Sequence, residues 1–361
     1  MKKKRGTILG LLLCCVVFTL GACSKENMKE DSSKKAIASS KVASIEIENG
    51  TYILPEDGDV TENTGYLALD VKINNIGKDT LNLSLEEINL YDEDDNKISQ
   101  KDIYTDDENF KKLQFESISG GKSTNGYVIF KVDKNKEYEL HYTPNSYLDD
   151  KKEDIQIKVE TKKYKDTSLD IQKIAESFVN DVFLNKKSEN KDIANNIEEE
   201  KTSFNVMFSK ALEKEFYYYK PSEAELMTNI DAFKNANAKK AKIDYSIKEF
   251  YPESATIYVK PETIHFDNLD TDSIISEFVD KNEGKYSDYE KAETDAEKYL
   301  LEQLPSKYET TSVSSNDSFS GEGYEIHFTK ENGKWKVDTS DSSDNYSFKS
   351  LKKAFMGDIN S

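Results

Sequence analysis

Cysteine and histidine are scarce in this chain of 361 residues, which has three of each. The cysteines all stand near the N-terminus: Cys14, Cys15 and Cys23. The rest of the chain therefore offers no disulfide, no thiol nucleophile and no cysteine-based metal site. The histidines stand far apart: His141, His265 and His327. None has a second histidine or a cysteine at metal-ligand spacing, so we expect structural histidines and no metal site.

A coherent catalytic signature is also missing. No Gly-x-Ser-x-Gly nucleophile motif occurs. Gly121-Lys122-Ser123 ends like a phosphate-binding loop, but Glu116 stands where that loop needs its first glycine. We therefore predict no catalytic residue, no cofactor and no enzyme. A carboxylate-dependent hydrolase stays open as an alternative, because the chain has 69 Asp and Glu residues that could form a catalytic pair.

Positive charge is in deficit, with 50 Lys and Arg against 69 Asp and Glu and a net charge of −19. Met1–Ala22 holds four basic residues and no acidic one, so the chain without it carries −23. Such a polyanion does not bind nucleic acid non-specifically, and anionic headgroups repel it. An exposed partner contact must therefore be cationic or locally apolar.

The N-terminus reads as a secretory signal peptide covering residues 1–22. Basic residues at positions 2–5 precede an apolar run from Ile8 to Leu20, which is too short for a membrane span of about 20 residues. Leu20-Gly21-Ala22-Cys23 then resembles the lipobox of bacterial lipoproteins. The resemblance implies cleavage before Cys23 and a diacylglyceryl group on its thiol. The protein would then be extracytoplasmic, anchored by membrane lipid on the outer face of the cell membrane, with residues 23–44 as the lipidated cysteine and a flexible tether.

Residues 45–160 alternate between apolar and polar positions, as Leu67, Leu69, Val71 and Ile73 illustrate. Seven or eight short strands with recurrent turn residues predict an antiparallel β-sandwich. Three stretches resemble an immunoglobulin-like domain of unknown function found in many Gram-positive lipoproteins: 65–75, 88–92 and 120–130. The resemblance implies an Ig-like fold and a cell-surface location, but no catalytic residues.

A polar boundary at 161–167 is followed by a helical period, which predicts an α+β domain over 168–340. We expect helices packed on a single antiparallel sheet of four strands, closed by a hairpin at Asn332-Gly333, with a diverged duplication as the alternative. The order and this hairpin resemble a C-terminal domain of unknown function in Firmicutes lipoproteins, and cystatin or NTF2-type folds. Residues 341–361 read as a polar tail with a short helix.

Two groups of residues are candidate contacts. Tyr217, Tyr218 and Tyr219 end a predicted helix and face different sides, so at least one should be exposed to a partner, although packing between helix and sheet is the commoner role. Asp92, Asp94 and Asn96 match the first positions of a calcium loop. The match fails at position 6 and at position 12, so an acidic hairpin turn is favoured and calcium is a weak alternative.

The sequence therefore predicts an α+β envelope lipoprotein that acts as a non-catalytic binding or interaction module for an unknown envelope protein or small ligand. We place a small-ligand site between the sheet and helices of the C-terminal half. A transporter-associated solute receptor is a second alternative, although such receptors need two α/β lobes around a cleft.

Overall fold

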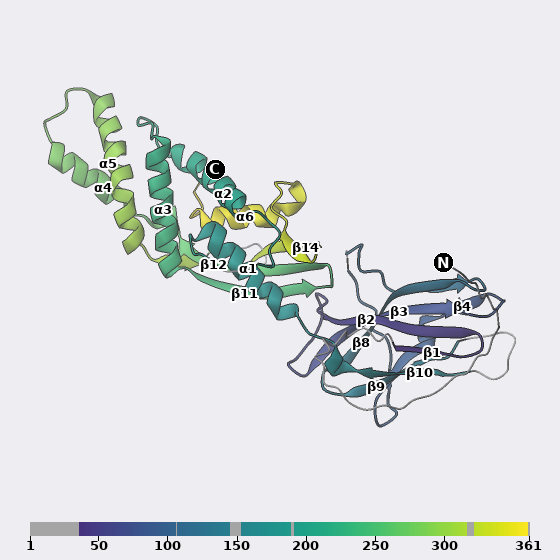
Figure 1. Ribbon diagram of the computed structural model, residues 1–361. Coiled ribbons are helices and arrows are strands. Elements are labelled where there is room, and N and C mark those ends of the chain that lie inside the picture. Colours follow the sequence, from purple (N-terminus) through teal and green to yellow (C-terminus); the bar gives the residue numbers. More distant parts are fainter. Residues whose placement is uncertain (1–35, 106, 145–152, 189–190, 316–320, 360–361) are drawn as a thin grey trace, which may run out of the picture. The chain divides into compact units, whose positions relative to one another are not determined.

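The structure is a computed structural model that describes residues 36–359, apart from residues 106, 145–152, 189–190 and 316–320 (Figure 1). The lipobox residues Leu20, Gly21, Ala22 and Cys23 lie outside the described residues. The chain is an α+β protein with antiparallel sheets, as predicted. None of the helices in the described part is long and apolar enough to cross a membrane.

The N-terminal half is a sandwich of two four-stranded antiparallel sheets, ordered β1-β2-β3-β8 and β10-β9-β5-β6, with a small β4-β7 pair beside them. Alternate residues of both sheets fill one core. In β3, Leu67, Leu69, Val71 and Ile73 are fully buried, and they meet Leu90 and other residues of the second sheet. The strands have these bounds: β1 Ala36–Ser39, β2 Ala43–Ile53, β3 Thr64–Asn75, β4 Leu81–Leu83, β5 Ile88–Tyr91, β6 Lys97–Ile98, β7 Glu116–Ile118, β8 Ser123–Asp133, β9 Glu137–Tyr142 and β10 Ile155–Glu160.

The folded chain begins earlier than the predicted tether allowed. Residues 36–39 form β1, which pairs with β2 from Ala36 opposite Ile47 to Ser39 opposite Ser44. Ala43 and Ile45 are fully buried. The expectation that 23–44 is a tether throughout is therefore wrong for its last part. The composition misled because β1 satisfies its backbone groups in the ladder, while its one large apolar side chain, Ile37, is 62% exposed and adds little to the core.

The C-terminal half has one antiparallel sheet, ordered β11-β12-β14-β15, as expected, with a short fifth strand, β13, paired to β12. Asn332 and Gly333 have φ values of 51° and 79°, the left-handed geometry of a two-residue hairpin turn between β14 and β15. The strands have these bounds: β11 Lys242–Phe250, β12 Ser254–Ile264, β13 Val313–Ser315, β14 Tyr324–Glu331 and β15 Lys334–Val337.

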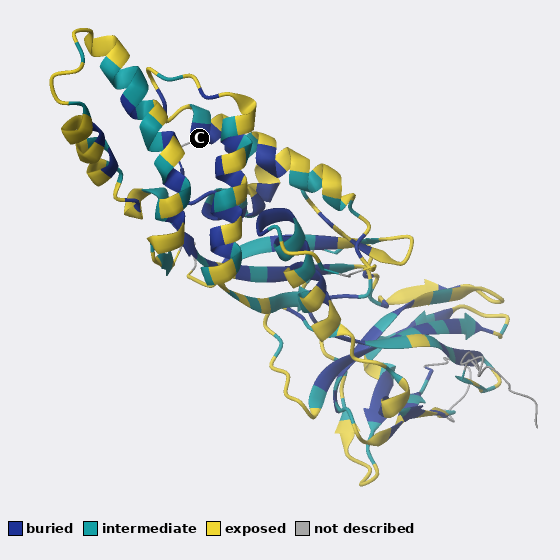
Figure 2. Cartoon of the chain, turned by 60° about the vertical axis from the view of Figure 1, so that its left-hand side comes forward, coloured by how far each residue is buried: buried dark blue, intermediate teal, exposed yellow. Residues whose placement is uncertain are grey.

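Helices α1, α3 and α6 contact this sheet, and α5 packs against α3 and α4. Buried residues lie mainly on the faces of helices and strands that are turned toward each other (Figure 2). Ser222 starts α3 with a capping box to Glu225, whose pKa falls to about 2 because Ser222 and Tyr219 donate hydrogen bonds to it. The helices have these bounds: α1 Ser168–Phe183, α2 Ile197–Glu213, α3 Glu223–Lys240, α4 Thr271–Asn282, α5 Tyr289–Thr310 and α6 Tyr346–Phe355.

The C-terminal segment has its predicted short helix, but it is not a polar tail. In α6, Phe348, Leu351 and Phe355 are buried in the same cluster as the inner face of the sheet. Thr263 of β12 donates a hydrogen bond to the carbonyl of Ala354. Residues 346–359 are therefore part of the C-terminal core, and the many serines and acids before them obscured an i, i+3, i+7 apolar stripe.

Residues 161–167, where we expect a domain boundary, make side-chain contacts with the sandwich. Thr161 is buried and donates a hydrogen bond to the carbonyl of Lys136, and the Lys134 ammonium lies 2.6 Å from the Asp166 carboxylate. Further on, Leu54 and Phe250 exchange two backbone hydrogen bonds of 2.9 and 2.7 Å. The division into domains at 45–160 and 168–340 stays a prediction.

Candidate functional site

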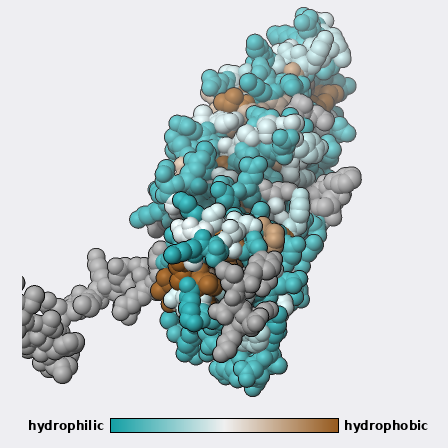
Figure 3. All heavy atoms as spheres, turned by 90° about the vertical axis from the view of Figure 1, so that its right-hand side faces the viewer, coloured by the Kyte–Doolittle hydropathy of each residue, from teal (hydrophilic) through white to brown (hydrophobic). Residues whose placement is uncertain are grey.

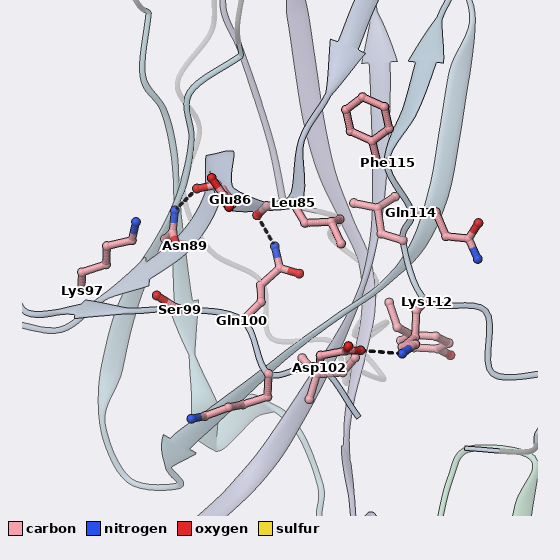
Figure 4. A pocket seen from close by; sticks show the side chains of 14 residues that line it. Leu85, Glu86, Asn89, Lys97, Ser99, Gln100, Asp102, Lys112, Gln114 and Phe115 are labelled. Atoms are coloured by element: carbon pink, nitrogen blue, oxygen red, sulfur yellow. Dashed lines mark hydrogen bonds and ion pairs between the residues drawn. The ribbon is translucent and has the colours of Figure 1, made fainter. Parts of the chain in front are cut away.

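A cavity of about 690 Å³ opens in the sandwich, within the size range of small-molecule sites. It lies beside β8, where residues 99–105 and 107–115 run outside the named helices and strands. Figure 4 shows its lining side chains, with Lys97 and Phe115 on different sides of the opening. The lining comes from four segments: 85–89, 97–102, 112–115 and the β8 residues Tyr127 and Ile129.

Two walls of the cavity are held to β8 by backbone hydrogen bonds. The first wall, 97–102, is fixed where the Lys101 amide donates to the Ile129 carbonyl at 2.8 Å. The second wall, 112–115, is fixed where the Leu113 amide donates to the Tyr127 carbonyl at 2.9 Å. A side chain at Gly126 would come within 2.6 Å of the Leu113 amide nitrogen. Glycine at this position therefore lets the second wall lie directly on β8.

Side-chain contacts hold the same walls together. The Lys112 ammonium lies 2.7 Å from a carboxylate oxygen of Asp102 and 2.6 Å from the carbonyl of Ile103. The Gln100 amide donates to the carbonyls of Leu85 and Ile88. These contacts join the first wall to the second and to β5.

The cavity combines an apolar base with a polar rim. Leu113 and Ile129 are buried, Leu85 is half-buried, and Phe115 is 72% exposed. Most of the face shown in Figure 3 is hydrophilic, and Phe115 is one of the large apolar side chains exposed on the described surface. Apolar side chains with a few polar groups around them are typical of a binding site for a small molecule.

The space between sheet and helices in the C-terminal half, where a small-ligand site is expected, is closely packed. Large aromatic side chains fill that space: Phe178, Phe183, Phe204, Phe208, Phe233 and Phe348 are each less than 2% exposed. Their rings contact one another, for example Phe183 and Phe204 with centroids 4.8 Å apart. These phenylalanines pack as a core. The expectation of a ligand site in this part of the chain stays a prediction.

The tyrosine triplet is divided between surface and core. Tyr217 is 87% exposed and Tyr218 is 38% exposed, with Tyr218 also near the ring of Tyr289. Tyr219 is half-buried, packs against the core and donates its hydroxyl proton to Glu225. The Glu297 carboxylate accepts hydrogen bonds from all three successive backbone amides of the triplet, at 3.0, 2.8 and 2.6 Å.

The weak calcium candidate is a self-closed turn between β5 and β6. One carboxylate oxygen of Asp92 accepts the backbone amides of Asp94 and Asn96, and the other accepts the Asn96 side chain. These hydrogen bonds, chiefly those from Asn96, lower the pKa of Asp92. Within the described residues, no group of three or more acidic, histidine or cysteine side chains could hold a metal ion.

The three histidines stand in separate places. His141 lies 2.7 Å from Asp154, and His265 lies 3.6 Å from Asp358. His327 lies on the sheet of the C-terminal half, 3.1 Å from the Thr256 hydroxyl.

A carboxylate-dependent hydrolase needs a pair of free carboxylates, and two glutamates of that sheet are candidates for such a pair. Glu249 accepts a hydrogen bond from Thr256, and partial burial raises the pKa of its carboxyl. Glu325 lies 3.0 Å from Lys248 and 3.5 Å from His327. Glu325 is therefore paired with the Lys248 ammonium and is not free to act as the second carboxylate of a glycosidase pair.

Sequence reasoning missed a buried lysine in the C-terminal half. The Lys234 side chain is fully buried, and its ammonium donates to the Val182 carbonyl at 2.8 Å and the Asn205 side-chain oxygen at 3.0 Å. Burial, with a smaller effect of Lys201, lowers its pKa to about 7. The signal was present, because Lys234 falls on the apolar stripe of α3 with Ile230 and Phe233.

Fold and site together define an α+β protein of antiparallel sheets with a cavity of about 690 Å³ in its sandwich. A family model described as a domain of unknown function, DUF4352, matches residues 29–153. The chain is 27% identical over 375 residues to the uncharacterized lipoprotein YcdA of Bacillus subtilis (strain 168), covering 99% of each. The crystal structure of that lipoprotein has the same fold, with a TM-score of 0.66 and 24% identity over 90% of this chain and 99% of that one.

Proposed function

We propose that this protein is a cell-envelope lipoprotein that binds a small ligand without transforming it. The cavity beside β8 carries the proposal, because it has the size and apolar base of a binding site. Diacylglycerol on Cys23 would anchor the protein to the outer face of the cell membrane. The lipobox resemblance and the full-length likeness to a lipoprotein support this anchor.

Metabolic labelling with a palmitate analogue tests the anchor. The wild-type protein should be labelled and should sediment with membranes. Cys23→Ala should lose both properties, and Cys15→Ala is the matched control that should keep them. A Cys23→Ala protein that is still labelled would refute the assignment.

Mass spectrometry of small molecules extracted from the purified lipoprotein tests ligand binding. Gln114 is an exposed lining residue, so Gln114→Trp should fill the cavity and remove the bound molecule. Asn125→Trp, an exposed position on β8 outside the lining, should keep it. Turnover of a glycan, ester or peptide that is lost in Glu249→Gln would instead favour the hydrolase.

The exposed tyrosines are a second proposed contact, for an envelope protein. Their exposure supports Tyr217 and Tyr218, whereas Tyr219 is occupied by Glu225 and the core. A photo-crosslinking residue at position 217 should capture a partner in intact cells, and one at position 210 on α2 should not. Equal capture at both positions would argue against a specific contact.

The solute-receptor alternative has no support in the described residues, whose named strands all pair antiparallel.

A further inference from the structure

We infer that the cavity beside β8 binds an amphiphilic anion, a molecule with an apolar body and one anionic head. This inference rests on the proposed function and adds the chemical class of the ligand. The apolar body is indicated by Leu85, Leu113 and Ile129 at the base and by the exposed ring of Phe115. A volume of about 690 Å³ accommodates a body of at least two fused rings.

The anionic head is indicated by the cations of the lining. Three lysines and two acids line the cavity, and Lys112 pairs with Asp102. Glu86 is then the one other acid of the lining, against Lys97 and Lys101. In the described part of the chain, no ion pair is recorded for either of these two lysines.

This local excess of positive charge stands out against the rest of the molecule. The whole chain has 19 more acidic than basic residues, so most of its surface repels an anion. The acidic turn at 92–95 does not line this cavity, although it precedes Lys97; its residues line a separate hollow with Glu137 and Lys158. An anion is therefore favoured at the cavity beside β8 over the surrounding surface.

The geometry also places the two parts of the ligand. Lys97 lies to one side of the opening and Phe115 to another (Figure 4), so a ring resting on Phe115 can direct its head toward the lysine side. Both side chains are solvent-exposed, so a ligand can reach them directly from solution. A cationic head in this position would meet like charges, and a neutral head would gain nothing from the lysines.

Three naphthalene probes with the same ring and different heads test the inference: 2-naphthoate, 2-naphthamide and 2-naphthylmethylammonium. Calorimetric titration would use the full-length lipoprotein in phosphatidylcholine nanodiscs, with empty nanodiscs as the blank. We expect 2-naphthoate to bind most tightly and the cationic probe to bind roughly tenfold more weakly or not at all. The double variant Lys97→Gln/Lys101→Gln should lose about tenfold in affinity for 2-naphthoate and keep its affinity for the amide.

Two controls separate the possible failures. Lys122→Gln removes an exposed lysine outside the lining and should change nothing, whereas Gln114→Trp should weaken all three probes. Equal affinities for acid and amide, unchanged in the lysine variant, would overturn the anion inference and leave the proposed binding function standing. Binding of no probe, or binding unaffected by Gln114→Trp, would overturn this inference. The absence of any co-extracted molecule would in addition contradict the proposed function.

Discussion

Replacing Lys234 with methionine should remove most of the pH dependence of stability of the C-terminal half near neutrality. The folded protein holds this lysine with a pKa of about 7, against 10.5 in the unfolded chain. Between these two values the unfolded chain binds a proton that the folded protein has released. Stability therefore rises with pH over this window and is reduced at and below pH 7.

The magnitude follows from the two pKa values. The full slope is about 1.4 kcal/mol per pH unit, reduced near pH 7 because the folded lysine is still half protonated there. The wild-type free energy of unfolding should therefore rise by about 2 kcal/mol from pH 7 to pH 9. Ionised carboxylates do not titrate in this interval. Tyr308 and Tyr245, whose pKa values burial raises, lose protons only at higher pH.

Urea unfolding monitored by tryptophan fluorescence is a suitable assay. Trp335 is the chain's one tryptophan, and it is buried in the same cluster as Phe233 of α3. It therefore reports on the half of the protein that holds Lys234. Lys234→Met should show a rise from pH 7 to pH 9 that is smaller by about 2 kcal/mol than in the wild type.

The comparison between pH values matters more than the stability of the variant at one pH. Methionine removes the cost of burying the amine, but it leaves the Val182 carbonyl and Asn205 without their donor, a loss of about 1–3 kcal/mol for buried groups. The loss of these two hydrogen bonds changes little with pH, whereas the cost of burying the amine falls as pH rises. Lys210→Met, at an exposed position on α2, is the matched control and should keep the wild-type slope. Parallel pH profiles for the wild type and Lys234→Met would refute the reasoning.

Two further substitutions test contacts described above. Gly126→Val should displace the wall at 112–115, cost about 1–3 kcal/mol of stability and abolish 2-naphthoate binding. Asn125→Val, on the same strand, should have none of these effects. Unchanged titrations of 2-naphthoate for both variants would contradict the close approach at Gly126. Glu297→Ala should speed amide hydrogen exchange at positions 217–219, because three amides lose their acceptor. Glu302→Ala is the control and should leave exchange at these positions unchanged. Equal protection of these amides in both variants would show that the Glu297 carboxylate does not hold this loop.

The regular elements were predictable because they bury one face. Alternation in residues 67–73 corresponds to β3, and the apolar stripe from Ile171 to Phe183 corresponds to α1. The C-terminal hairpin followed from Asn332-Gly333 because the turn needs positive φ at both residues. Where the strand was short, as in β1, or the apolar residues were diluted by polar neighbours, as in α6, the same patterns gave the wrong boundary.

The cavity was less accessible to sequence reasoning. The two walls 97–102 and 112–115 lie mostly between β6 and β7, show no periodicity and are positioned by backbone hydrogen bonds to β8. Such bonds leave little trace in side-chain types, apart from the glycine at 126. Phe115 could have been noticed as an aromatic residue outside any stripe, but its exposure depends on where the wall lies. The tyrosine triplet was visible in the sequence, whereas its acceptor, Glu297, is 78 residues or more away.

The bond between Lys112 and Asp102 has a consequence for the rate of ligand exchange. It connects the two walls of the cavity, each of which is also bonded to β8, so the opening does not depend on a wall moving aside. Entry should then be limited by diffusion and orientation rather than by a gating step. Differences in affinity among ligands would appear in their dissociation rates, and a bound molecule would exchange rapidly with its surroundings unless its apolar body fits the base closely.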